Sequence, residues 1–167
     1  MTLLRITPFL LRLRAVALIL AALCAVPMPA TAKDVALTVI IGSGPPMTFE
    51  MSELTDMPRT EIVTSTVWTA GQIRFAGVRL HDLMTTVDAK GAKLRAIALN
   101  DYAMEIPMTD AAPDGPIIAY EMDGKPMSVR EKGPLWIIYP YDSEQRFRTE
   151  TIYGRSVWQL VRIEVQD

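Results

Sequence analysis

The sequence predicts a single α+β domain of mixed architecture in which β-strands dominate. Short apolar runs of about five to eight residues recur along the chain and are separated by Gly, Pro, Asn or Asp. Only two segments show features of a helix. The dipeptide Asp123-Gly124 lies between two of the apolar runs, and it is typical of a tight β-hairpin turn.

The apolar runs predict strands at residues 35–41, 47–51, 60–67, 73–78, 94–99, 116–122, 134–140 and 158–165. Residues 51–58 predict one helical turn, with Ser52 as its N-cap and Pro58 as its end. Residues 79–87 predict a longer helix whose buried face repeats with helical spacing, at Leu80, Leu83, Met84 and Val87. We find no internal repeat, low-complexity tract or interdomain linker.

The first 32 residues have the pattern of a secretory signal peptide. Arg5, Arg12 and Arg14 precede or open an apolar run over 15–26, and the small residues Ala30-Thr31-Ala32 follow it. The alternative is an uncleaved membrane anchor, but the run is shorter than the roughly 20 residues that cross a bilayer. We therefore expect cleavage after Ala32, a domain over 33–167, and a periplasmic or secreted protein without a stable membrane anchor.

Composition narrows the kinds of partner and of chemistry. The chain carries 17 Lys and Arg against 19 Asp and Glu, and cleavage would remove three arginines and make it more acidic. Such a charge does not favour nucleic acid or an anionic membrane as partner. The single cysteine, Cys24, lies in the signal, and His81 is the only histidine. A structural zinc site needs about four Cys or His ligands and a catalytic one about three, so a zinc enzyme is not expected.

Five segments, in order, resemble the molybdopterin-binding domain of the sulfite oxidase family. They are "FEMSELTDMP", "FAGVRLHDLM", "LNDYAMEIPMTDA", "IIAYEMDGKPMSVREKGPLWIIYP" and "YGRSVWQLVRIEV". The resemblance covers nearly all of residues 45–166 and implies a shortened, mostly β form of that fold. It also implies that a molybdenum-ligating cysteine should follow the first short helix, at the end of the next strand. That position falls at or next to Ser65, and a hydroxyl is a poor ligand for such a metal compared with a thiolate.

Two further departures from the family pattern concern basic residues that would hold a pterin pyrophosphate. Trp136 stands where the family has arginine, and the lysine expected before Trp158 is missing. Arg146, Arg148 and Arg155 remain as possible substitutes. The signal also lacks a twin-arginine pair, so the chain is expected to cross the membrane unfolded, whereas the family implies that cofactor is inserted into folded protein in the cytoplasm. The sequence therefore favours a protein without cofactor, with bound molybdopterin as the alternative.

The resemblance predicts that loop residues line the former cofactor cleft as a ligand-binding site. These are Thr64, Ser65, Thr66, Trp68, Thr69, Asn100, Asp101, Tyr102, Tyr139, Tyr141, Asp142 and Arg155. Residues 100–102 are equally consistent with a simple turn. Trp136 and Trp158 lie within strand-like runs, so we place both in the core, with each indole N–H bonded to a backbone carbonyl.

Other chemistry has weaker support. A catalytic triad of Ser65, His81 and Asp101 is conceivable, but the chain lacks the G-x-S-x-G motif, and His81 is expected on a helix surface beside Asp82. Methionine pairs such as Met104 and Met108 raise the possibility of copper(I), although scattered methionines are usually core residues.

We conclude from the sequence that the protein senses a ligand or binds a partner, and that it is not expected to be an enzyme. A small polar molecule, a membrane-bound signalling protein, or both, are the expected partners. The alternative is an atypical molybdopterin-dependent oxidoreductase in which a hydroxyl replaces the cysteine. A third possibility is an interaction protein that has neither cofactor nor pocket.

Overall fold

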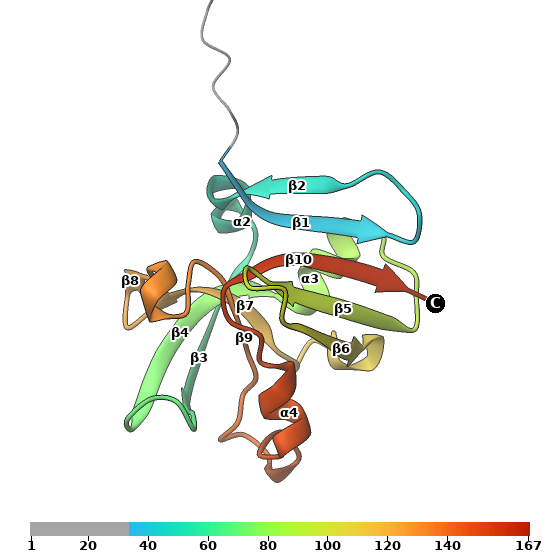
Figure 1. Ribbon diagram of the computed structural model, residues 1–167. Coiled ribbons are helices and arrows are strands. Elements are labelled where there is room, and N and C mark those ends of the chain that lie inside the picture. The colour runs from blue at the N-terminus through green and yellow to red at the C-terminus, as the bar shows by residue number, and fades with distance from the viewer. Residues whose placement is uncertain (1–33) are drawn as a thin grey trace, which may run out of the picture. The chain divides into compact units, whose positions relative to one another are not determined.

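The computed structural model describes residues 34–167, and β1 (Val35–Ile41) is the first strand. Alternation along β1 buries Leu37 and Val39 in the core, as expected for a strand with one face covered. β1 lies in a five-stranded sheet. From edge to edge the sheet contains β2 (Met47–Glu50), β1, β10 (Leu160–Gln166), β5 (Lys93–Ala98) and β6 (Ala103–Pro107). β1 and β10 pair in parallel, so the first and last strands lie side by side (Figure 1).

A second sheet contains the strand that ends at Ser65. Its strands are β3 (Arg59–Ser65), β4 (Gln72–Arg79), β7 (Ile117–Met122) and β8 (Lys125–Pro126), and β9 (Trp136–Ile138) also pairs with β7. All of these pairings are antiparallel. A bulge interrupts the β4–β7 pairing at Gly77, where a Cβ atom would overlap the carbonyl of Ile118. Figure 1 shows β3 and β4 as a long hairpin that projects from the rest of the domain.

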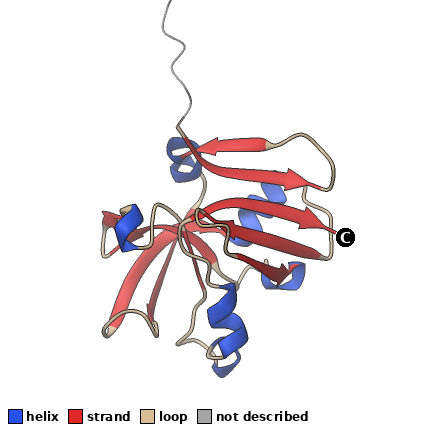
Figure 2. Ribbon diagram, viewed as in Figure 1, coloured by secondary structure: helices blue, strands red, loops and turns tan. Residues whose placement is uncertain are grey.

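Helices are short and lie between or beside the sheets (Figure 2). The α-helices are α2 (Met51–Asp56), α3 (Leu80–Thr86) and α4 (Glu150–Arg155), and the 3-10 helices are η1 (Met108–Asp110), η2 (Val129–Glu131) and η3 (Gln145–Phe147). α3 buries Leu80, Leu83 and Met84 as predicted. Both sheets contribute to one hydrophobic core, which includes Leu37, Phe75, Ile118, Trp136 and Ile163.

The predicted fold class is confirmed, and eight of the strands fall where apolar runs predicted them. The Asp123-Gly124 turn is also confirmed, with φ values of 49° and 75°. The predicted N-cap of α2 was wrong: Glu50 occupies that position and forms a capping box with Glu53, while Ser52 lies within the helix. Sequence reasoning missed β6, β8, α4 and the 3-10 helices.

The predicted signal peptide, residues 1–32, and its cleavage site lie outside the described residues. Within residues 34–167, none of the helices is long and apolar enough to span a membrane.

Candidate ligand-binding pocket

The end of β3 is joined to the loop after β9 by a carboxylate. The backbone N–H and the hydroxyl of Ser65 both donate hydrogen bonds to Asp142, each at 2.7 Å. In return, the Asp142 N–H donates to the buried Thr64 hydroxyl at 3.0 Å. The Ser65 hydroxyl and N–H, with help from Gln72, hold the pKa of Asp142 below its usual value. We call these three residues, Thr64, Ser65 and Asp142, the carboxylate clamp.

Two longer side chains support the carboxylate clamp from outside. Gln72 donates to Asp142 at 3.3 Å. Arg148 forms a salt bridge with Asp142 at 3.2 Å and donates from Nε to the Tyr141 carbonyl at 2.8 Å. The hydroxyl and carboxylate groups of the clamp therefore form hydrogen bonds with one another, and its three residues do not line the pocket described below.

A polar turn after β3 orients Trp68. The Thr66 hydroxyl lies 2.8 Å from that of Thr69 and accepts a hydrogen bond from the Trp68 N–H at 3.0 Å. The two threonines thus close the turn rather than face a ligand, and they do not line the pocket.

The indole of Trp68 lies at the centre of an aromatic cluster. Its ring contacts four others edge to face, with centroid distances of 5.6 Å to Trp136, 6.4 Å to Tyr141, 5.8 Å to Tyr153 and 5.7 Å to Trp158. These distances and the steep interplanar angles suit aromatic pairs, which avoid face-to-face stacking. The turn after β3 is thereby joined to β9, to α4 and to the segment before β10.

The rings on the inner side of this cluster belong to the core. Trp136 is fully buried, and its indole N–H donates to the Ser156 carbonyl at 3.1 Å, as predicted. Tyr141, which we expected in the cleft, is 1% exposed, and its hydroxyl donates to Ser156 at 2.6 Å. Burial raises the pKa of Tyr141, so its phenol stays protonated.

Trp158 was predicted in the core and instead lies at the surface, with 36% of the residue exposed. It precedes β10 rather than opening it, and the next residue, Gln159, adopts a positive φ of 50°. The Gln159 N–H donates to the carbonyl of Lys132, which also has a positive φ, of 76°. Two residues in this uncommon conformation hold Trp158 in its outward position, with the Lys132 ammonium 4.2 Å from the ring centroid.

Tyr139 and Arg155, also expected in the cleft, belong to a separate network. Both donate to the Asp110 carboxylate, the tyrosine at 2.8 Å and the arginine at 3.0 Å. Burial, together with the negative charge of Asp110, raises the pKa of Tyr139 and keeps it a donor. Arg155 lies at the end of α4, not in a loop as predicted. Its charge is neutralised by Asp110, and it does not line the pocket.

The segment Asn100-Asp101-Tyr102 is both a turn and part of the pocket. Asp101 has a φ of 64°, and the side-chain oxygen of Asn100 accepts a hydrogen bond from the backbone N–H of Tyr102 at 3.2 Å. This turn presents Asn100 and Tyr102 to the pocket, while Asp101 is exposed and outside it.

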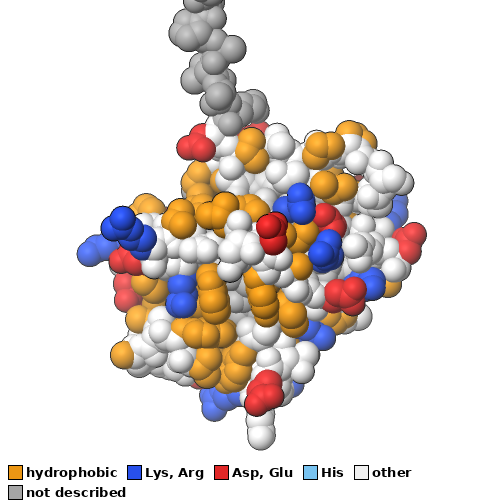
Figure 3. All heavy atoms as spheres, in the orientation of Figure 1, with side chains coloured by type: hydrophobic (Ala, Val, Ile, Leu, Met, Phe, Trp, Pro, Cys, Tyr) orange, Lys and Arg blue, Asp and Glu red, His pale blue; other side chains and the backbone are white. Residues whose placement is uncertain are grey.

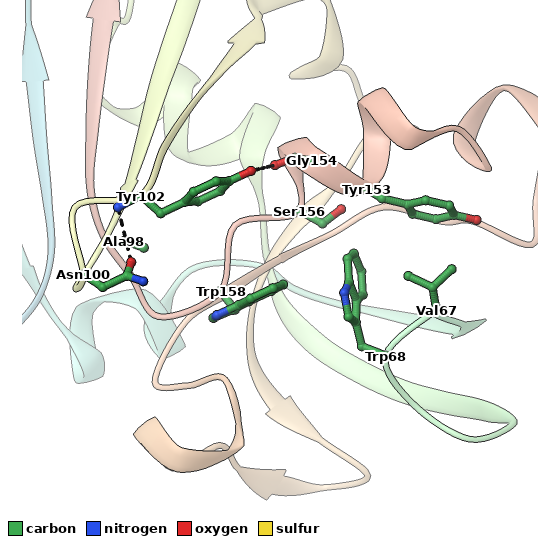
Figure 4. A pocket seen from close by; sticks show the side chains of 9 residues that line it. All are labelled: Val67, Trp68, Ala98, Asn100, Tyr102, Tyr153, Gly154, Ser156 and Trp158. Carbon is green, nitrogen blue, oxygen red and sulfur yellow. Dashed lines mark hydrogen bonds between the residues drawn. The ribbon is translucent and has the colours of Figure 1, made fainter.

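The pocket has a volume of about 390 Å³, which is within the range of small-molecule sites. Its walls are mainly aromatic and aliphatic (Figure 4). They are formed by Val67, Trp68, Ala98, Asn100, Tyr102, Tyr153, Gly154, Ser156 and Trp158. Of the residues predicted for the site, Trp68, Asn100 and Tyr102 line the pocket, and the other nine do not.

Sequence reasoning missed the wall from α4, which supplies Tyr153 and Gly154. A signal was present, because Thr149 is a good N-cap and its hydroxyl accepts from the Ile152 N–H.

On the face shown in Figure 3, hydrophobic side chains gather below the centre. Three of the pocket residues, Val67, Tyr102 and Trp158, are among the exposed large hydrophobic residues.

The alternative catalytic and metal sites are not assembled. His81 lies on α3 and bonds to Asp82 at 2.9 Å, while Ser65 bonds to Asp142, so the proposed triad is not formed. The methionines weighed as copper ligands, including Met104 and Met108, pack against the core. Among residues 34–167, no group of three His, Cys, Asp or Glu residues could hold a metal ion.

A family model described as "oxidoreductase molybdopterin binding domain" matches residues 24–166, so the chain belongs to this family. Among solved structures, the sulfane dehydrogenase SoxCD from Paracoccus pantotrophus is similar, with a TM-score of 0.63 and 19% sequence identity. The similarity covers 84% of this chain but 40% of the SoxCD chain. At this identity it shows a shared fold, here the sulfite-oxidase-type molybdopterin-binding fold. The sequence has no match among curated proteins.

The donor groups around the pocket do not fit a molybdenum-bearing pterin. At Ser65, at or next to the position where the family resemblance expects the metal-ligating cysteine, the hydroxyl donates to a carboxylate, which would repel an anionic cofactor. A pyrophosphate needs several cationic or backbone donors, yet among residues 34–167 no charged side chain lines the pocket, and the Lys132 ammonium lies over the Trp158 ring instead. The nearby arginines, Arg146, Arg148 and Arg155, are each paired with a carboxylate. We therefore derive no chemistry that depends on the cofactor.

Proposed function

We propose that this member of the family binds a small molecule in the aromatic pocket and acts as a sensing or partner-binding protein, without molybdopterin and without catalysis. The observation that carries the proposal is the pairing of two features. The carboxylate clamp contains Ser65, at or next to the position where the family resemblance expects the metal ligand, and a pocket of about 390 Å³ lies between other residues of the same domain.

The construction of the pocket supports binding rather than incidental surface shape. Its Trp158 wall is held outward by backbone at Lys132 and Gln159 in an uncommon conformation, which costs free energy and tends to persist where it serves a site. The opposite wall, Trp68, is fixed by the threonine turn and by contacts with four other rings. A ligand would meet a rigid site, and little entropy would be lost in ordering it.

We also propose that the protein is periplasmic or secreted and that it interacts with a membrane-bound signalling protein. The predicted signal peptide supports the location. Exposed apolar patches often mark interaction sites, and hydrophobic residues around the pocket are exposed. We therefore expect the partner to bind at this surface, with an affinity that depends on whether the pocket holds a ligand.

A thermal-shift screen against small metabolites tests the proposal, using wild type, Trp158→Ala and Leu99→Ala. Leu99 is the matched control because it is exposed and adjacent to the pocket turn but does not line the pocket. We expect at least one metabolite to raise the Tm of wild type and of Leu99→Ala but not of Trp158→Ala. If every metabolite that shifts wild type shifts Trp158→Ala equally, the pocket is not the binding site.

A further inference from the structure

Three polar side-chain groups of the pocket already have partners within the protein. The Tyr102 hydroxyl donates to the Gly154 carbonyl at 3.2 Å, and the side-chain oxygen of Asn100 accepts from the Tyr102 N–H. The Ser156 hydroxyl accepts from a buried tyrosine and donates to a carbonyl of α4. These groups are not available to a ligand without breaking internal hydrogen bonds.

Four polar side-chain groups of the pocket remain free. Within residues 34–167, the amide nitrogen of Asn100, the indole N–H groups of Trp158 and Trp68, and the hydroxyl of Tyr153 have no hydrogen-bond partner. The Asn100 and Trp158 nitrogens, both donors, lie at the end of the pocket away from Val67, whereas the Tyr153 hydroxyl points away from them (Figure 4). A complementary molecule therefore has an apolar body and a hydrogen-bond acceptor at one end.

The charge near the pocket favours a ligand whose acceptor group is acidic over one that is neutral or basic. Lys132 forms no salt bridge within residues 34–167, and its ammonium lies over the Trp158 ring at 4.2 Å. An aromatic pocket can also hold a cation, but this ring is already engaged by one, and a second would be repelled. Among the residues that the structure describes, 34–167, no carboxylate lines the pocket to offset that repulsion.

From these features, and resting on the proposed function, we propose that the ligand is a small apolar carboxylate, such as an aromatic or short aliphatic acid. Its carboxylate would accept from Asn100 and Trp158 in the field of Lys132, and its apolar body would contact Trp68 and Val67.

Three probes with the same phenylethyl body test the ligand class: 3-phenylpropionate, 3-phenylpropionamide and 2-phenylethyl-trimethylammonium. The readouts are tryptophan fluorescence and titration calorimetry. Fluorescence reports on the pocket because the chain has three tryptophans, of which Trp68 and Trp158 line the pocket and Trp136 contacts the Trp68 ring. We expect the acid to bind about tenfold tighter than the amide, because charge-assisted hydrogen bonds are stronger than neutral ones, and the ammonium to bind weakest.

Two substitutions with little change in shape sharpen the test. Asn100→Asp keeps the acceptor that holds the turn but replaces the free donor with a negative charge, so acid binding should fall at least about tenfold while the amide is less affected. Lys132→Met keeps the length of the side chain and removes its charge, so the preference for the acid over the amide should shrink by about threefold or more.

The possible failures can be told apart. If the amide or the ammonium binds as tightly as the acid, and Trp158→Ala abolishes that binding, the pocket is a site and the proposed ligand class is wrong. If none of the probes binds, the ligand class is also wrong, and the metabolite screen then decides separately whether the pocket binds anything. Acid binding that is unchanged by both Asn100→Asp and Trp158→Ala would place the acid elsewhere and overturn the inference.

Discussion

Asp142→Asn removes the charge of the carboxylate clamp with little change in its shape. The wild-type carboxylate accepts two hydrogen bonds from Ser65 at 2.7 Å, and an asparagine can keep two neutral bonds by rotating its amide. Charge-assisted hydrogen bonds are about twice as strong as neutral ones, so the loss at pH 7 should be about 1–2 kcal/mol of unfolding free energy. For a domain of this size, that corresponds to a fall in Tm of about 3–6 °C for each kcal/mol.

The effect of this substitution should depend on pH. The pKa of Asp142 is lowered in the folded protein, chiefly by the hydrogen bond from the Ser65 hydroxyl. Its stabilising contribution is therefore complete above the unfolded pKa of about 3.9 and is lost as the pH falls through the lower folded value. The difference in stability between wild type and Asp142→Asn should be largest at neutral pH and should shrink below about pH 4.

Urea denaturation at neutral and acidic pH measures the effect, with Asp114→Asn as control. Asp114 also pairs with an arginine, Arg146 at 2.9 Å, but its side chain is 67% exposed, so its loss should cost less than about 0.5 kcal/mol. Equal destabilisation by the two substitutions would refute the clamp. So would an Asp142→Asn effect that stays the same from pH 7 to pH 3.

Three further predictions follow from packing and from the sequence. Trp136→Ala, at a fully buried position, should cost about 3–5 kcal/mol, whereas Trp158→Ala should cost less than about 2 kcal/mol; urea denaturation giving the reverse order would contradict the assignment of core and pocket. Gly77→Ala should cost about 3 kcal/mol or more of unfolding free energy, because the added Cβ would overlap a backbone carbonyl. Gly71 faces open space at a φ of 66°, so Gly71→Ala should cost only about 1 kcal/mol. Similar Tm values for the two variants would contradict this prediction. Intact-mass analysis of exported protein should find Lys33 at the N-terminus, and retention of residues 1–32 would exclude the predicted cleavage.

The strands were predictable because each is a local pattern of apolar residues between turn signals. β1 matches its predicted bounds, and the hairpin at Asp123-Gly124 follows from the φ preferences of two residues. The helix α4 was missed because its six residues contain Gly154 and the β-branched Thr151 and Ile152, which weaken the helical signal. Its stability comes from packing instead, through Ile152 in the core.

The pocket was harder to predict because its walls depend on contacts between distant segments. The family resemblance placed Tyr139 and Tyr141 in the cleft, but both are buried, and their hydroxyls donate to Asp110 and Ser156, which are remote in sequence. Trp158 was expected in the core because it lies within a strand-like run. The positive φ of Gln159, which no local pattern predicts, turns it outward instead. The position of Ser65 at the end of β3 did follow from the family resemblance.

Metal analysis of protein purified from its native compartment tests the central claim most directly. Ser65, at or next to the position where the family resemblance expects a thiolate, donates to a carboxylate, and among residues 34–167 no charged side chain lines the pocket to hold a pyrophosphate. We therefore predict that elemental analysis finds no stoichiometric molybdenum and that the protein nonetheless binds ligand in the aromatic pocket. Molybdenum present in stoichiometric amount with the chain would contradict the claim and identify the protein as an oxidoreductase with an atypical hydroxyl ligand.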